Sequence, residues 1–177
     1  IPALTSKKID MIVGSMSITE ERMKTIDFSD KYYDTPTGIM GPKDEKFDAT
    51  PASLAGKIIG VQVSTVHADY AKKHFTEAAE IKEYQTQDEA NQDLAAGRID
   101  AVQADAIALD AFLASDAGKC CELKGNVEND TAVLGLGVGI GVRKGEAELL
   151  GKINASLAKL KANGTVDKIL DKWGLKG

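Results

Sequence analysis

Residues that could bind a charged group are concentrated in the segment "GSMSITEER", Gly14 to Arg22, which follows the apolar run "IDMIV". Thr19 can cap a short helix, and Glu20 and Glu21 suit its first turn because the helix dipole favours negative charge there. The dipole does not explain Arg22, since it disfavours a cation at that place. A guanidinium beside backbone N–H groups and two serine hydroxyls suits a carboxylate held at two points. A solvated arginine paired with a neighbouring glutamate is the alternative.

Two further polar positions follow runs that are expected to be strands. In "GVQVSTVHADY", Ser64 and Thr65 open a helix. Hydroxyls there usually cap the helix, but a helix N-terminus also attracts anions. Asp105 in "IDAVQADAIAL" ends another strand, where a carboxylate either caps the next helix or pairs with a ligand ammonium group. Arg22, Thr65 and Asp105 together would recognise the zwitterionic head of an amino acid.

Motifs typical of catalytic and cofactor sites are incomplete. "GSMSI" lacks the last glycine of the G-x-S-x-G elbow. His67 and His74 are the only histidines, and no zinc ligand set accompanies them. "GLGVGIG" has glycine at every second position, unlike a dinucleotide-binding loop. We therefore expect no cofactor and no metal, and Asp105 is the only evident candidate for a general acid.

Composition narrows the classes of partner. The 177 residues carry a net charge of −5, so no basic surface is expected to neutralise the phosphates of a nucleic acid. No apolar run approaches the roughly 20 residues of a membrane helix, so we expect no membrane insertion. The chain opens without Met, which suggests a processed chain or a fragment whose true start lies upstream. The adjacent Cys120 and Cys121 are expected to be two thiols, since a bridge between neighbours is strained.

The apolar pattern alternates between short strands and helical periods, which predicts parallel sheets covered by helices. Expected strands cover residues 9–15, 57–63, 80–84, 99–104 and 133–142. Expected helices cover residues 19–26, 65–75, 88–97, 106–115, 146–164 and 165–173, with Gly97 and Gly164 closing two of them.

Two similar segments favour two lobes. "LTSKKIDMIVGS" and "LAAGRIDAVQAD" align Asp10 with Asp100, and so Ser15 with Asp105. Ser15 and Asp105 would then each lie at the carboxyl end of a strand, where open α/β sheets bind ligands. The alternative is that the two segments are similar by chance. The segment "YYDTPTGIMGPKDE" is interpreted as a crossing and turn between lobes, and "ENDTAVLG" as the return. The predicted domains are residues 1–36 with 136–177, and residues 37–135.

Four segments in order resemble a known family. "KKIDMIVGSMSITEERMKTIDFSDKYYDTP", "GKIIGVQVSTVHADYAKK", "AAGRIDAVQAD" and "LAKLKANGTVDKILDKWG" are similar to periplasmic solute-binding proteins for polar amino acids, which serve ABC importers. The resemblance is closest to the branch for lysine/arginine/ornithine, histidine and opines, and it covers essentially the whole chain.

The resemblance implies an α/β, two-lobed periplasmic binding protein type 2 fold that closes by a hinge on a ligand between the lobes. It implies a periplasmic location and delivery of an amino acid to a membrane permease. Arg22, Ser17 and Thr65 would hold the ligand carboxylate, and Ser15 and Asp105 would meet its ammonium group. The pocket edge would be lined by Ser64, Val66 and His67.

The chain departs from the family pattern at two places. Gly14 stands where a small polar residue is common, which leaves room for a substituent on the ligand nitrogen, as in an opine. The first portion of lobe one is missing by comparison with the family, so lobe one is expected to be incomplete. Two alternatives stay open: an enzyme on the same fold, similar to cyclohexadienyl dehydratase, and a ligand-sensing domain of a larger receptor.

Overall fold

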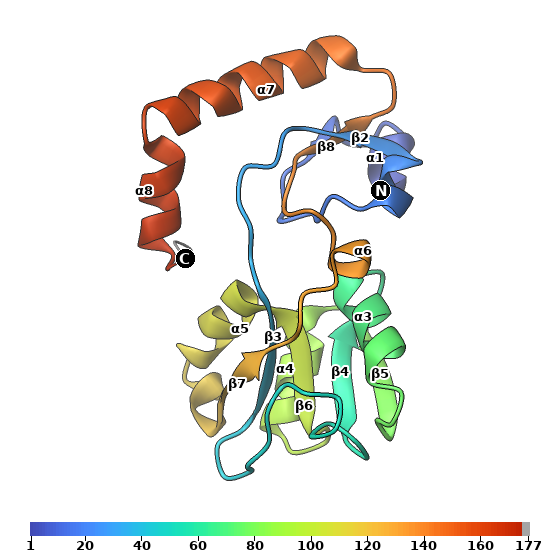
Figure 1. Cartoon of the computed structure of the whole chain (residues 1–177), viewed down its shortest axis with the longest axis vertical. Helices are drawn as coiled ribbons and strands as arrows, with labels where there is room; N and C mark the ends of the chain where they lie inside the picture. The colour runs from blue at the N-terminus through green and yellow to red at the C-terminus, as the bar shows by residue number, and fades with distance from the viewer. Residues whose placement is uncertain (175–177) are drawn as a thin grey trace. The chain divides into compact units, whose positions relative to one another are not determined.

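The computed structural model describes residues 1–174, and the chain forms two compact units (Figure 1). Unit one consists of Ile1–Thr35 and the described residues from Gly135 onward. Unit two is the continuous segment Pro36–Leu134. The chain therefore enters and leaves unit two once each, and each unit has its own sheet and its own buried side chains.

Unit two is built on a five-stranded sheet with the order β5-β4-β6-β3-β7. Its strands are β3 (Thr37–Pro42), β4 (Ile58–Gln62), β5 (Glu80–Tyr84), β6 (Ala101–Asp105) and β7 (Cys121–Asn126). Its helices are α3 (Val66–His74), α4 (Gln87–Ala95), α5 (Ala106–Leu113), the 3-10 helix η1 (Ala117–Cys120) and α6 (Thr131–Leu134).

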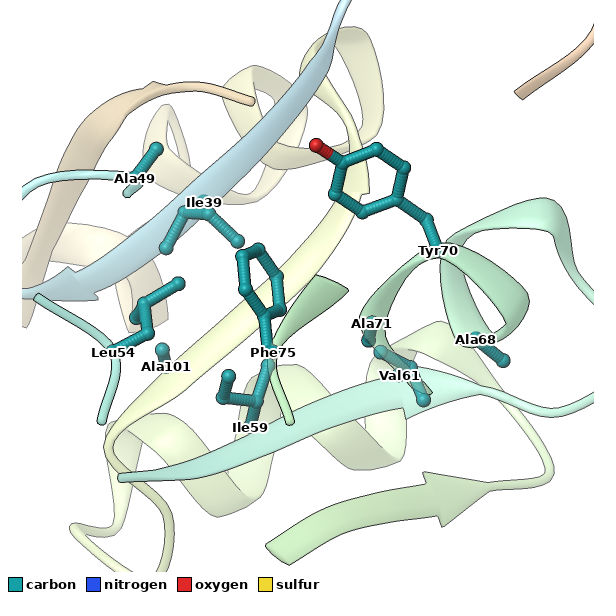
Figure 2. Close-up of a cluster of buried hydrophobic side chains, with 10 residues drawn as sticks. All are labelled: Ile39, Ala49, Leu54, Ile59, Val61, Ala68, Tyr70, Ala71, Phe75 and Ala101. Carbon is teal, nitrogen blue, oxygen red and sulfur yellow. The ribbon is translucent and has the colours of Figure 1, made fainter. Parts of the chain in front are cut away.

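The sheet of unit two has a hydrophobic cluster on each face. Successive side chains of a strand point to opposite faces, so Ala101 and Val102 of β6 pack into different clusters. Figure 2 shows the first cluster, in which α3 and the loop residues that follow β3 contribute side chains around the sheet. Its members are Ile39, Ala49, Leu54, Ile59, Val61, Ala68, Tyr70, Ala71, Phe75 and Ala101.

Strand β3 corrects the interpretation of "YYDTPTGIMGPKDE" as only a crossing and turn. Residues Thr37 to Gly41 are buried, and β3 lies between β6 and β7. The glycines that suggested a turn are required by close packing. A Cβ on Gly38 would lie 2.9 Å from the Leu123 side chain, and one on Gly41 would lie 2.3 Å from the Phe47 ring.

The expectation of parallel strands holds for only part of the sheet of unit two. Strand β4 is parallel to β5 and β6, but β3 is antiparallel to both β6 and β7. The expected strand 133–142 is wrong in extent, since residues 131–134 form α6 and β8 covers only Gly141–Arg143. Gly135 and Gly137 have φ of +90° and +111°, a left-handed backbone that interrupts a strand.

Unit one contains a small antiparallel sheet, in which β8 lies between β1 (Met11–Ile12) and β2 (Ile26–Phe28). Its helices are α1 (Pro2–Thr5), α2 (Glu20–Met23), α7 (Ala147–Ala162) and α8 (Thr165–Lys172). The buried side chains of this unit include those of Leu4, Ile18, Ile26, Val138, Val142 and Leu157. The expectation of a buried strand over residues 9–15 is wrong, because only Met11 and Ile12 pair with another strand and Val13 is 63% exposed.

The predicted helix ends are confirmed where a capping residue or a glycine marked them, but the expected helix 19–26 is too long, because α2 ends at Met23 and Ile26 begins β2. Thr19 Oγ1 accepts from the Arg22 N–H at 3.2 Å, and Thr65 Oγ1 accepts from the Ala68 N–H at 3.2 Å. Gly97 and Gly164 follow α4 and α7 with φ of +67° and +73°, as expected for glycines that end helices.

The cysteine interpretation is wrong. Cys120 and Cys121 form a disulfide at the junction of η1 and β7, and neither is a free thiol. The backbone changes from helix to extended strand between these two residues, which turns neighbouring side chains toward each other.

Candidate functional site

Unit one carries a group of residues that we call half-site one: Gly14, Ser15, Ser17, Arg22 and Tyr33. Gly14, Ser15 and Ser17 lie on the segment that precedes α2, Arg22 lies in α2, and Tyr33 follows β2. Ser17 and Tyr33 each form an isolated antiparallel bridge with Val138, whose side chain is buried. The Tyr33 hydroxyl donates to Ser15 Oγ. The return segment around Val138 therefore holds both parts of half-site one in register.

Arg22 is the cation of half-site one. Its backbone N–H is used by the Thr19 cap, so its main chain is fixed at the start of α2. Its guanidinium Nη1 donates to the Ser17 carbonyl at 3.0 Å, and the side chain is half-buried. This contact occupies Nη1, and a planar guanidinium has further donors that can recognise a carboxylate at two points. Glu21, one of the neighbouring glutamates, lies 2.5 Å from Lys24 Nζ, and the predicted alternative of an Arg22–glutamate pair stays open.

Unit two carries half-site two: Thr37, Ser64, Thr65, Val66, His67 and Asp105. Ser64 and Thr65 follow β4, Val66 and His67 form the first turn of α3, and Asp105 ends β6. Strands β4 and β6 are parallel neighbours, so their carboxyl ends lie at the same edge of the sheet. Thr37 is opposite Asp105 in the antiparallel pair of β3 and β6.

The Thr65 hydroxyl is engaged twice at the start of α3. It donates to the Gln62 carbonyl at 2.7 Å and accepts from the Ala68 N–H. To donate to a ligand carboxylate it would have to release the Gln62 carbonyl. The capping role expected for Thr65 is therefore present, and its ligand role stays a prediction.

Asp105 does not cap the helix that follows it. No hydrogen bond joins its side chain to the start of α5, so the structural alternative for this residue is not supported. Its Oδ2 lies 3.6 Å from His67 Nε2, too long for a hydrogen bond but close enough for charge attraction. The carboxylate is 26% exposed, whereas the His67 side chain is 10% exposed. The Asp105 carboxylate is thus partly exposed to solvent, and the more buried His67 imidazole lies next to it.

Each half-site contains one serine in the left-handed backbone region. Ser15 has φ of +54° and Ser64 has φ of +62°, and neither position is a glycine. This conformation costs roughly 1–2 kcal/mol for a residue with a Cβ. Strain of this kind is frequent at ligand-binding sites, but Lys7, outside both half-sites, also has φ of +61°, so the backbone alone does not identify a site.

The two similar segments of the sequence contribute one tip to each unit, Ser15 to unit one and Asp105 to unit two. Their shared aspartates are structural. Asp10 pairs with Arg143 at 3.1 Å, and Asp100 accepts from the Ile58 N–H at 2.7 Å.

The sequence analysis missed Tyr33 and Thr37. Both lie in the segment interpreted as a crossing, so neither was considered as a site residue. The signals available in the sequence were the aromatic pair Tyr32–Tyr33 and the threonine that precedes the segment "GIM".

Residues 1–174 contain neither a candidate metal-binding cluster nor a candidate membrane-spanning helix. No group of three or more His, Cys, Asp or Glu side chains in this range is arranged to hold a metal ion. Within the same range, every helix is too short or too polar to cross a membrane.

Comparison with known proteins places this chain. Residues 1–176 match the family described as bacterial extracellular solute-binding proteins, family 3, and the chain belongs to that family. The L-arginine-binding protein of Pseudomonas aeruginosa PAO1 is 45% identical over 175 residues, which are 98% of this chain and 68% of that protein. The histidine-binding periplasmic protein of Salmonella typhimurium LT2 is 38% identical over 98% of this chain and 67% of its own length.

Solved structures agree with this assignment. An ancestral arginine-binding protein bound to arginine superposes with a TM-score of 0.87 at 36% identity, covering 97% of this chain and 74% of that one. The predicted α/β, type 2 periplasmic binding protein fold is therefore confirmed. The chain therefore belongs to a family of solute-binding proteins, and the curated relatives named here are binding proteins rather than enzymes.

Proposed function

We propose that this protein binds a polar or basic amino acid, or an opine-like derivative of one, in the periplasm and delivers it to the permease of an ABC importer. The observation that carries the proposal is the opposite charge of the two half-sites. Half-site one presents the Arg22 guanidinium, and half-site two presents the Asp105 carboxylate. An amino-acid head group carries the complementary pair, a carboxylate and an ammonium.

Both half-sites would contribute to each end of the head group. Arg22, with Ser17 and Thr65, would bind the carboxylate, and Asp105, with Ser15, would bind the ammonium group. Ser64, Val66 and His67 would line the site beside them. One ligand that engages both groups would favour the conformation in which both contacts are made, and the importer would recognise that conformation.

The chemistry of the relatives supports a basic ligand. One is named for L-arginine and another for histidine. Gly14 supports the opine-like alternative, because a Cβ at this position would meet nothing within 4 Å. The space beside the proposed ammonium position could then accept a substituent on nitrogen.

Calorimetric titration against a panel tests the proposal. The panel contains L-arginine, L-lysine, L-ornithine, L-histidine, L-glutamine and an arginine-derived opine. We expect at least one basic member to bind, and Asp105→Asn to weaken it by about 10- to 100-fold, since a hydrogen bond to a charged group contributes roughly 1.5–3 kcal/mol. No binding by any panel member, or unchanged affinity of the Asp105→Asn variant, would refute the proposed function.

A further inference from the structure

His67 has contacts on both ring nitrogens that the proposed head-group recognition does not use. Its Nδ1 lies 3.3 Å from Thr37 Oγ1, and its Nε2 lies 3.6 Å from Asp105 Oδ2. The ring belongs to the first turn of α3 and is buried, so it cannot swing freely into solvent. It is therefore held in place between a hydroxyl and a carboxylate.

The hydroxyl partner is compatible with both charge states of the ring. Thr37 Oγ1 can donate to a neutral imidazole at Nδ1, or it can accept from the N–H that an imidazolium carries there. The Nε2 position faces Asp105 in either state. Thr37 thus fixes the orientation of the His67 ring and allows the ring to gain or lose a proton.

Asp105 is the carboxylate nearest to His67. Strands β3 and β4 carry no charged side chain, and β6 carries only Asp105. The other charged groups on elements packed against α3 are paired elsewhere: Glu83 of β5 with Lys72, Lys82 of β5 with Asp93, and Asp130 before α6 with Lys73 and His74. Glu80 of β5 and Asp69 of α3 are exposed to solvent.

We propose that His67 exchanges its proton for the ligand's ammonium group. With no ligand, a protonated His67 balances the charge of Asp105. When an ammonium group binds Asp105, two cations would face one carboxylate, and His67 releases its proton to solvent. This inference rests on the proposed function, because it needs Asp105 to bind the ammonium group of the ligand.

The proposal predicts a specific pH dependence. A protonated His67 competes with the ligand for Asp105, so affinity falls as pH falls. Complete exclusion of one cation by the other would weaken binding by up to about tenfold for each unit by which pH falls between about 7.5 and 5. L-arginine is the appropriate probe, because neither its guanidinium nor its ammonium group loses its proton in this range.

The chain supplies a matched control, because it has two histidines and both lie on α3. His74, at the other end of the helix, pairs with Asp130 at 2.8 Å. We expect His67→Asn to abolish the pH dependence of L-arginine affinity between about pH 5 and 7.5, and His74→Asn to keep it. Thermal unfolding of each variant shows whether it is folded.

Proton release by the wild-type protein is an independent measurement. Titrations of L-arginine at about pH 6 in two buffers with different ionisation enthalpies give the number of protons released. Net proton release on binding in wild type and none in His67→Asn is the expected result. A flat wild-type pH profile with no proton release overturns the proposal, as does a His67→Asn profile that coincides with wild type.

Failure of the proposed function gives a different result. If neither L-arginine nor any other panel member binds at any pH, head-group recognition fails and the inference fails with it. If L-arginine binds and Asp105→Asn weakens it, but affinity does not change with pH, only the role of His67 is refuted.

Discussion

Replacing Arg22 separates the charge of half-site one from its geometry. Arg22→Ala removes both the guanidinium and its contact with the Ser17 carbonyl, whereas Arg22→Lys keeps the charge and loses the planar fork. Loss of one partner from a desolvated charge pair typically costs about 2–5 kcal/mol, which is roughly 30-fold to several thousand-fold in affinity. We expect the alanine variant to lose this amount and the lysine variant to lose less.

The structure also gives the effect on stability. Both variants lose the 3.0 Å hydrogen bond to the Ser17 carbonyl, a net contribution of about 1 kcal/mol, or about 2–4 °C in Tm for a chain of this size. Titration at a temperature well below the transition therefore measures binding by folded protein. Arg98→Ala is the matched control, because this exposed arginine pairs with Asp93 in unit two. Binding by Arg22→Ala within threefold of wild type would make Arg22 a structural residue and refute the assignment.

Three further substitutions test other parts of the molecule. Gly14→Ser should leave the fold intact and weaken an arginine-derived opine while sparing L-arginine; equal weakening in calorimetry would contradict the steric argument. Gly60→Ala should destabilise the protein by about 1–3 kcal/mol in urea unfolding, because the new Cβ would lie 2.6 Å from Ile99 Cδ1 in a packed core, and an unchanged midpoint would show that the core adapts. The hydrogen bond from Lys73, followed by that from His74, lowers the pKa of Asp130 to about 2, so its stabilisation is complete above about pH 4 and is lost as pH falls toward 2. The Tm difference between wild type and Asp130→Asn should therefore close between about pH 4 and pH 2, and a constant difference would contradict this.

Capping residues and helical periodicity were the most reliable guides to the fold. Thr19, Thr65, Gly97 and Gly164 mark helix ends through local backbone chemistry, which needs no knowledge of tertiary packing. Strand β3 could not be predicted in the same way. Gly38 and Gly41 lie in it because side chains from distant residues approach the backbone, and that requirement is not visible locally.

The candidate site could be predicted in its residue types but not in its internal contacts. Arg22 was identified because the helix dipole does not explain a cation in that first turn, and Asp105 because a carboxylate at the end of a strand can pair with a ligand ammonium group. The contact of His67 with Thr37 joins residues 30 positions apart, across α3 and β3, and depended on a strand that the sequence did not reveal. The hydrogen bond from Tyr33 to Ser15 was hidden for a similar reason, since it joins two irregular segments.

The position of β8 between β1 and β2 has a consequence for synthesis on the ribosome. Both early strands use β8 as their partner, and Ser29 beside β2 bonds to Ile140, 111 residues later. At about 5–20 residues per second, the nascent segment that carries β1 and β2 waits on the order of ten seconds for that partner. All five strands of the larger sheet emerge during this interval and can pair at once. The inserted unit can therefore fold first, while the segment that carries Arg22 is still without its sheet and exposed to chaperones and proteases.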